Sequence, residues 1–137
     1  MEKKSIELAC IIDDDNIYVN LIKKIIETKA LCENLIVFND GKQSIEYFEA
    51  LLQNLDKDRI PDIIFLDLNM PIMDGWQFLE RFTKIKNKFG KVITLYIVSS
   101  SIYPEDINRA KSLETVEDYL IKPVIISDLA KLFGKAV

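Results

Sequence analysis

The sequence contains no histidine, and this absence excludes several kinds of chemistry at once. Catalytic triads and Cys-His dyads need an imidazole as general base, and most protein zinc sites use histidine ligands. Two cysteines, Cys10 and Cys32, are too few for a disulfide framework and do not form a CxxC metal motif. Cys10 lies in an apolar run and is expected to be buried. Any reaction here therefore depends on carboxylates, hydroxyls, lysines or a hard metal ion.

The chain also lacks long apolar runs and a strong excess of either charge. No segment approaches the roughly 18 apolar residues of a membrane span, and residues 1–5 lead into no secretory apolar segment. We therefore expect a cytoplasmic protein that does not associate with membranes. The net charge of −4 provides no excess of Lys and Arg for phosphate contacts, which weighs against a nucleic-acid partner.

What is present fits one globular domain. The 137 residues are 49% hydrophobic and 29% charged, with no linker or low-complexity tract. We expect residues 1–137 to form a single domain with no output domain. Short apolar runs alternate with longer segments of helical spacing. The runs are Ile6–Ile12, residues 35–38, Ile63–Leu66, residues 92–98 and residues 119–121.

The segments between the runs place apolar residues on one helical face. In the first segment this set is Ile17, Leu21, Ile25 and Ile26. Because the strands are apolar throughout rather than alternating, both of their faces are expected to be buried, as in a parallel sheet. Five strand–helix repeats predict an α/β fold of the (βα)5 type, doubly wound around a five-stranded parallel sheet.

Polar residues follow several of these strands at the point where each strand ends. In an open parallel sheet, ligands bind at the carboxyl ends of the strands near a topological switch point. Carboxylates gathered there repel each other unless a cation lies among them, and Mg2+ prefers oxygen ligands. A phosphoryl group would use lysine and hydroxyl donors, so the set indicates phosphoryl transfer. Its members are Asp13, Asp14, Asp15 and Asn16 after the first strand, Asp67 after the third, Ser99, Ser100 and Ser101 at the fourth, and Lys122 after the fifth.

Each of these residues also has a simpler explanation. Asp15 or Asn16 is expected to cap the next helix, since both residue types favour that position. Asp67 could cap the loop that follows it, and Lys122 could be an ordinary surface lysine. N-capping does not account for an acidic pair directly after an apolar strand. Several strand ends that fit a single chemistry favour the functional interpretation.

In order and spacing, these motifs resemble the receiver domain of two-component response regulators over essentially the whole chain. The matching segments are residues 11–14, 65–71, 73–75 and 119–123, together with Ser99. The resemblance implies a flavodoxin-like, CheY-like stand-alone domain with strand order 2-1-3-4-5. It also implies a sensor histidine kinase or a histidine phosphotransfer protein as phosphate donor, and a downstream protein effector. Such a protein is not an enzyme beyond its own phosphorylation and slow dephosphorylation.

The resemblance assigns the metal and the phosphoacceptor to particular residues. It implies that Asp67 is phosphorylated and that Mg2+ is the cofactor. Asp14 would bind Mg2+ directly and Asp13 largely through water. Asp67 and the backbone carbonyl of Asn69 would complete the protein ligands. Lys122 would pair with the phosphoryl oxygens.

The same resemblance implies a switch. Ser99 would donate its hydroxyl to the phosphoryl group, and Tyr119 would then turn inward and change a protein-binding face. Ser100 is the alternative to Ser99. We favour Ser99 because Asp106 then matches a fourth-helix position of the family.

Two local features depart from the family pattern, and both lie before the fifth strand. Residues 112–118 replace the usual Gly-Ala pair. The separation of Ser99 and Lys122 is 122 − 99 = 23 positions, about one more than usual. Pro123, by contrast, matches the family's cis-proline. We expect an altered connection into the fifth strand.

Two other functions fit parts of the pattern. A Mg2+-dependent phosphohydrolase also uses an aspartyl nucleophile, but it usually has an acid two residues later for general acid–base catalysis, where this chain has Asn69. An interaction module that is never phosphorylated would not need Asp67 and Lys122 together. The receiver interpretation accounts for all of these residues.

Overall fold

The computed structural model describes residues 6–135, in which strands and helices alternate along the chain. The strands are β1 (Ile6–Ile12), β2 (Cys32–Phe38), β3 (Ile63–Leu66), β4 (Thr94–Ser99) and β5 (Val116–Ile121). The helices are α1 (Asn16–Thr28), α2 (Gly41–Leu51), α3 (Gly75–Ile85), α4 (Pro104–Lys111) and α5 (Ile126–Lys135), with short 3-10 turns η1 (Lys57–Arg59) and η2 (Lys86–Phe89). Within this part of the chain, no helix has both the length and the apolar character needed to cross a bilayer.

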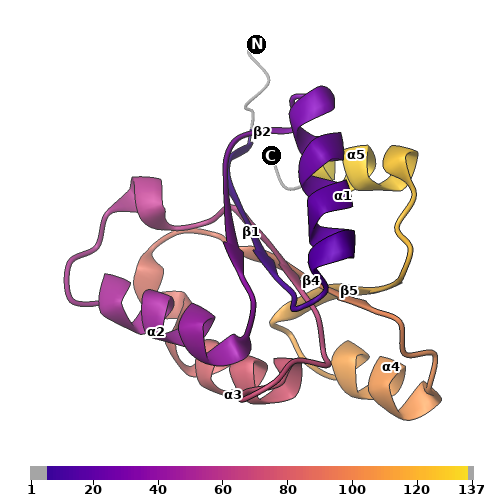
Figure 1. Cartoon of the computed structure of the whole chain (residues 1–137). Coiled ribbons are helices and arrows are strands. Elements are labelled where there is room, and N and C mark those ends of the chain that lie inside the picture. The colour runs from indigo at the N-terminus through magenta and orange to yellow at the C-terminus, as the bar shows by residue number, and fades with distance from the viewer. Residues whose placement is uncertain (1–5, 136–137) are drawn as a thin grey trace.

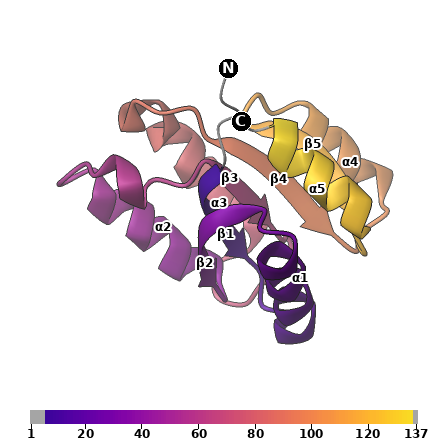
Figure 2. The same ribbon diagram turned by 90° about the horizontal axis from the view of Figure 1, so that it is seen from above.

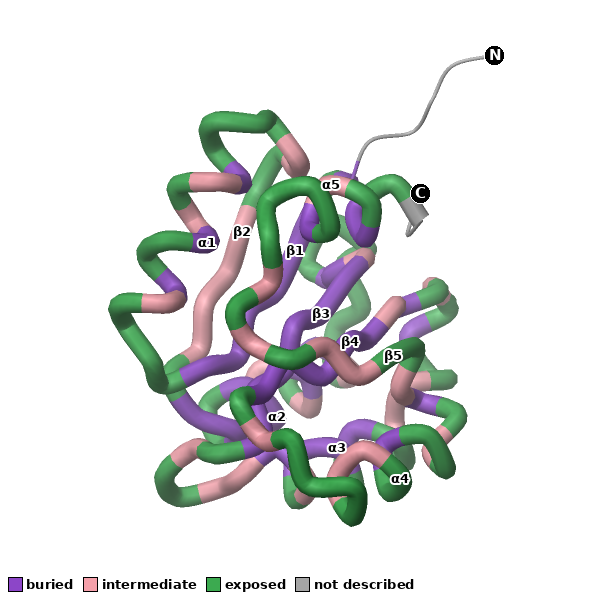
Figure 3. The backbone as a smooth tube through the Cα atoms, turned by 90° about the vertical axis from the view of Figure 1, so that its right-hand side faces the viewer, coloured by how far each residue is buried: buried purple, intermediate pink, exposed green. Residues whose placement is uncertain are grey.

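The strands form one parallel sheet in the order β2-β1-β3-β4-β5, which confirms the predicted fold and strand order. In the centre, Leu66 of β3 pairs with Ile12 of β1 and with Ile97 of β4. This register brings the carboxyl ends of the three central strands to the same edge of the sheet. Figure 3 shows these strands buried along most of their length, while β2 at one edge is only partly buried.

Helices cover both faces of the sheet, as the apolar strands predict. Figure 1 shows α1 and α5 on one face and α2, α3 and α4 on the other. From above, α1 lies beside β1 and β2, and α5 lies in front of β4 and β5 (Figure 2). The α2–α3 face is filled by aromatic rings, with Phe48 only 5.1 Å from Phe82 and 6.1 Å from Phe78 between ring centroids. Cys10 is fully buried in this cluster, as expected.

Helix α1 presents a different face to the sheet from the one predicted. Val19, Ile22 and Ile26 are buried, whereas Ile17 is 86% exposed and Leu21 is 54% exposed. Apolar residues cover a wide arc of this helix, so spacing alone did not determine which part of the arc faces the sheet. Of the predicted set, only Ile26 is fully buried.

The pairing of β5 with β4 contains a register shift. Leu95 pairs with Val116, but the next residue of β4, Tyr96, pairs with Asp118. Glu117 is therefore an additional residue in β5, and the register shift is typical of a β-bulge. Just before the bulge, the hydroxyl groups of Thr115 and Thr83 lie 2.8 Å apart and tie this segment to α3. Beyond the shift the pairing continues regularly to Ser99 and Ile121, so Lys122 lies directly after the end of the strand.

Candidate functional site

Three carboxylates meet at the carboxyl edge of the sheet. Asp13 directly follows β1 and its N–H donates to the carbonyl of Phe38 at 3.0 Å, while Asp67 follows β3 and its N–H donates to the carbonyl of Ile12 at 2.8 Å. These backbone bonds extend the sheet by one residue on each strand. One carboxylate oxygen from each of Asp13, Asp14 and Asp67 lies within 4.8 Å of the others. The structure therefore brings together the side chains predicted to bind the metal.

The cluster is electrostatically unfavourable without a cation. Asp13 and Asp67 are only 2% and 6% exposed, while Asp14 is exposed. Burial, followed by the negative charge of Asp13, raises the pKa of Asp67 well above its ordinary range. Lys122 and a hydrogen bond from the Asn69 backbone lower that pKa only in part. The two buried acids have carboxylate oxygens within 4.8 Å of each other. Such a pair can coordinate a hard divalent cation, which binds carboxylate and carbonyl oxygens.

Lys122 supplies positive charge from the end of β5. Its ammonium lies 2.8 Å from Asp13 Oδ2 and 4.0 Å from Asp67 Oδ2. Its backbone N–H donates to the carbonyl of Ser99 at 2.9 Å, which fixes the end of β5 to the end of β4. The following peptide bond, to Pro123, is cis, and this confirms the prediction for that bond.

The three consecutive serines occupy three different environments. Ser99 is the last residue of β4 and is fully buried, whereas Ser100 is exposed. Ser101 is the centre of the β4–α4 loop: its N–H donates to Ser99 Oγ at 3.1 Å, and its hydroxyl donates to Asp106 of α4 at 2.6 Å. Ser99 is thus the hydroxyl at the strand end, and Ser101 links it to α4.

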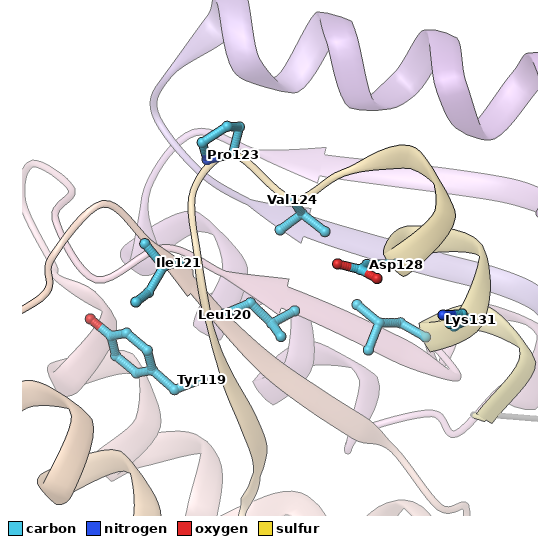
Figure 4. A pocket seen from close by; sticks show the side chains of 8 residues that line it. Tyr119, Leu120, Ile121, Pro123, Val124, Asp128 and Lys131 are labelled. Carbon is cyan, nitrogen blue, oxygen red and sulfur yellow. The ribbon is translucent and has the colours of Figure 1, made fainter.

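Tyr119 contacts the same loop from β5. Its hydroxyl donates to the carbonyl of Ser101 at 2.8 Å, and its half-buried ring packs against the core beneath α4. Figure 4 shows that Tyr119 and Leu120 point to opposite sides of β5. A groove of about 360 Å³ runs between β5 and α5; Tyr119 and Leu120 both line it, and Asp128 and Lys131 lie on its α5 wall. Tyr119 therefore contacts both the β4–α4 loop, which we call the serine loop, and the groove between β5 and α5.

The loop after Asp67 leaves no space for a side chain at Gly75. A Cβ there would lie 2.4 Å from the Asp67 carbonyl oxygen and 2.8 Å from Leu68 Cα. The Gly75 N–H donates to the Leu68 carbonyl at 2.9 Å, so α3 begins directly against the residues that follow β3. Asp74 caps α3 in a capping box with Gln77. Asn69 lies in the exposed part of this loop.

The N-cap beside the site was predicted from the sequence, whereas one residue at the edge of the site was not. Asp15 is the N-cap of α1 and accepts from the Tyr18 N–H at 3.1 Å, as predicted for Asp15 or Asn16. The Tyr18 ring was not anticipated: its centroid lies 4.5 Å from the Lys122 ammonium. The available signal was its position in the first turn of the helix that follows the acidic residues, three residues after the Asp15 cap.

Comparison with known proteins agrees with this geometry. The sequence model of the response regulator receiver domain matches residues 9–133. The chain is 26% identical over 124 residues to the probable methanogenesis regulatory protein FilR2 of Methanothrix harundinacea, covering 90% of this chain and 77% of that protein. It is 25% identical over 126 residues to response regulator Rcp1 of Synechocystis, covering 92% of this chain and 83% of that protein.

Solved structures place the fold in the same family. A two-component response regulator from Cytophaga hutchinsonii superposes with a TM-score of 0.81 at 28% identity, covering 97% of this chain and 98% of that chain. The Mn2+-bound form of Rcp1 superposes with a TM-score of 0.71 at 23% identity, covering 94% of this chain and 90% of that chain. With its predicted strand order, its acidic edge and a family match over most of its length, the chain belongs to the response regulator receiver domain family.

Proposed function

We propose that this receiver domain accepts a phosphoryl group on Asp67 from a phosphohistidine of a sensor histidine kinase or a histidine phosphotransfer protein. The observation that carries the proposal is the placement of Asp67: a buried carboxylate at a strand end, beside Asp13 and 4.0 Å from the Lys122 ammonium. A carboxylate oxygen of Asp67 attacks phosphorus and forms a P–O bond. The P–N bond to the donor breaks, and its electron pair stays on the imidazole nitrogen.

The acidic cluster supports Mg2+ as the cofactor of this transfer. Asp13, Asp14, Asp67 and the backbone carbonyl of Asn69 would hold the ion. When bound, it neutralises charge that develops on the phosphoryl oxygens. The related Rcp1 has been solved in an Mn2+-bound form, and Mn2+ uses the same class of oxygen ligands.

Lys122 and Ser99 are proposed to contact the transferred group. A phosphoryl group adds about 1.5–2 negative charges and new acceptor oxygens. The Lys122 ammonium can pair with those oxygens while its backbone stays bonded to Ser99. The Ser99 hydroxyl accepts from the Ser101 N–H at 3.1 Å and can still donate its own proton to a phosphoryl oxygen. A movement of Ser99 toward that oxygen would pull on Ser101 and so alter the β4–α4 loop.

The proposed output is a change in the surface around β5. Tyr119 is hydrogen-bonded to the Ser101 carbonyl and lines the groove between β5 and α5. A shift of the β4–α4 loop would therefore move Tyr119 and change the shape of the groove. Phosphorylation would then shift the population between two conformations of this face and change its affinity for a protein effector. Phosphoryl transfer requires direct contact with a kinase or a phosphotransfer protein. We propose that this contact takes place in the cytoplasm.

Acetyl phosphate and Mg2+ provide a direct test. We expect the protein to gain the mass of one phosphoryl group and Asp67→Asn to gain none. Asp62→Asn is the matched control, because Asp62 precedes the same strand at its opposite end, where it pairs with Lys91 at 2.9 Å. It should be phosphorylated like the wild type. Equal labelling of Asp67→Asn would overturn the proposal, and steady hydrolysis of a phosphomonoester would instead favour the phosphohydrolase.

A further inference from the structure

The Lys122 ammonium is surrounded on more than one side. Asp13 and Asp67 approach it as anions, and the face of the Tyr18 ring lies 4.5 Å away as a neutral neighbour. The lysine side chain is only 14% exposed. A lysine carries its charge on a flexible four-carbon stem, so its position depends on what surrounds the ammonium. The ring is the neighbour that the phosphoryl chemistry described above does not use.

The Tyr18 ring is itself firmly placed. It belongs to the first turn of α1, where the Asp15 side chain accepts from the Tyr18 N–H at 3.1 Å. The half-buried ring packs against the core cluster beneath α1 and α5. Lys122 comes from the end of β5, 122 − 18 = 104 positions later in the chain. A ring fixed to α1 therefore limits the movement of a lysine that belongs to β5.

The chemistry of the ring suits this location. An aromatic face attracts an ammonium through its quadrupole when the cation lies within about 6 Å of the centroid. Unlike a third carboxylate, the ring adds no negative charge that would repel an incoming phosphoryl group. Burial and the nearby Asp13 and Asp67 carboxylates raise the pKa of Tyr18 to about 12, so the phenol stays neutral at physiological pH.

We propose that Tyr18 is a positioning residue for phosphoryl transfer: its ring holds the Lys122 ammonium beside Asp67, where the ammonium meets the phosphoryl oxygens. This role rests on the function proposed above. Tyr18 takes no part in breaking or forming bonds. Its ring restricts the conformations of the Lys122 side chain, so that the ammonium is already near its productive position before the reaction.

Beryllofluoride binding in the presence of Mg2+ is the measurement, because this anion imitates the phosphoryl group on a carboxylate. We expect Tyr18→Leu to weaken the binding about tenfold, which corresponds to about 1.4 kcal/mol. Tyr18→Phe keeps the ring face and should restore binding to within about twofold of the wild type, because the attraction resides in the ring. The matched control is Tyr47→Leu, which removes a half-buried tyrosine from the opposite core cluster and should leave the affinity unchanged.

Proton NMR of the free protein tests the contact itself. The ring current of Tyr18 should shift the Lys122 side-chain methylene protons upfield in the wild type and in Tyr18→Phe, and not in Tyr18→Leu. Equal beryllofluoride affinity of the wild type and Tyr18→Leu overturns the positioning role. So does an affinity loss in Tyr18→Phe as large as that in Tyr18→Leu. If the wild type binds no beryllofluoride and Asp67 takes up no phosphoryl group, the proposed function fails and this role fails with it.

Discussion

The Lys122 ammonium lies closer to Asp13, at 2.8 Å, than to Asp67, at 4.0 Å. In this structure the lysine is therefore mainly the counter-ion of Asp13 and only secondarily that of Asp67. Asp13 is almost fully buried, so it depends strongly on that cation. A metal ion in the cluster and the lysine are thus two sources of positive charge for the same carboxylates.

Replacing Lys122 with methionine should expose this dependence. We expect Lys122→Met to lower the free energy of unfolding by about 3 kcal/mol in metal-free buffer, because a buried carboxylate loses its partner. Mg2+ should restore part of the loss, since it neutralises the same group. Urea unfolding with and without Mg2+ measures both quantities.

Lys91→Met is the control for that experiment. Lys91 pairs with Asp62 at 2.9 Å, away from the acidic cluster. Its removal should lower stability by an amount that Mg2+ does not change. A Lys122→Met loss that is equally insensitive to Mg2+ would show that the ammonium does not balance the acidic pair.

The raised pKa of Asp67 predicts a pH dependence of stability. Burial and then Asp13 raise this pKa from 3.8 to about 7. A carboxyl group whose pKa is higher in the folded than in the unfolded protein stabilises the fold at low pH, and that contribution is lost as pH rises through the native pKa. Without metal, Asp67→Asn should therefore become more stable relative to the wild type as pH rises from 3.8 to about 7.

Thermal unfolding of both proteins at several pH values, in the presence of a chelator, measures this difference. The difference in melting temperature should grow steadily across the window and then level off. It should shrink when Mg2+ is added, because a bound cation favours the ionised form. A constant difference at every pH would contradict the raised pKa.

Gly75→Ala should damage both stability and phosphoryl uptake. The added Cβ would meet the backbone of Asp67 and Leu68, which cannot move aside as a flexible side chain can. We expect a loss of about 2–3 kcal/mol from this overpacking. We also expect slower phosphorylation by acetyl phosphate, because Asp67 must shift.

Gly90→Ala separates the two effects. Gly90 has a φ of 65° and nothing within 4 Å of a Cβ, so alanine there costs about 1 kcal/mol of left-handed strain without touching the site. Its phosphorylation rate should match that of the wild type. A normal rate in Gly75→Ala would mean that the close approach of α3 does not hold Asp67 in place.

Ser101→Ala should separate phosphoryl uptake from the response at β5. The substitution removes the hydroxyl that donates to Asp106 at 2.6 Å but keeps the backbone groups that contact Ser99 and Tyr119. We expect phosphorylation to proceed normally. The chemical-shift changes that beryllofluoride produces in α4 should become smaller, since the loop is no longer tied to that helix.

Ser112→Ala is the matched serine variant, because its hydroxyl donates to the nearby Arg109 carbonyl at 2.6 Å. Nuclear magnetic resonance spectra of both variants with beryllofluoride make the comparison. A full α4 response in Ser101→Ala would rule out this hydroxyl as a link between the serine loop and the helix.

The sequence predicted the central strands better than those at the edge. Ile6–Ile12 and Ile63–Leu66 were predicted with their observed bounds, because a strand buried on both faces is apolar throughout. For β5 only residues 119–121 were predicted, although the strand begins at Val116. Glu117 and Asp118 are exposed there, since an edge strand needs less burial. The first residues of β2 were missed for the same reason.

The site divides in a similar way. The acidic pair, Asp67 and Lys122 were predictable because each directly follows a strand and the strands are parallel. The Tyr18 contact with Lys122 depends on how α1 is rotated and on the side-chain conformation of a residue 104 positions away. Ser101 was inseparable from its two serine neighbours by residue type alone. Its role appears only when the hydrogen bonds of the loop are known.

The origin of Lys122 in the last strand of the sheet bears on how the protein is made. Asp13 and Asp67 leave the ribosome with β1 and β3, well before the residue that balances their charge. Until β5 has docked beside β4, a nascent chain holds crowded acids without their ammonium. The same docking step that completes the sheet therefore also completes the charge balance of this acidic cluster.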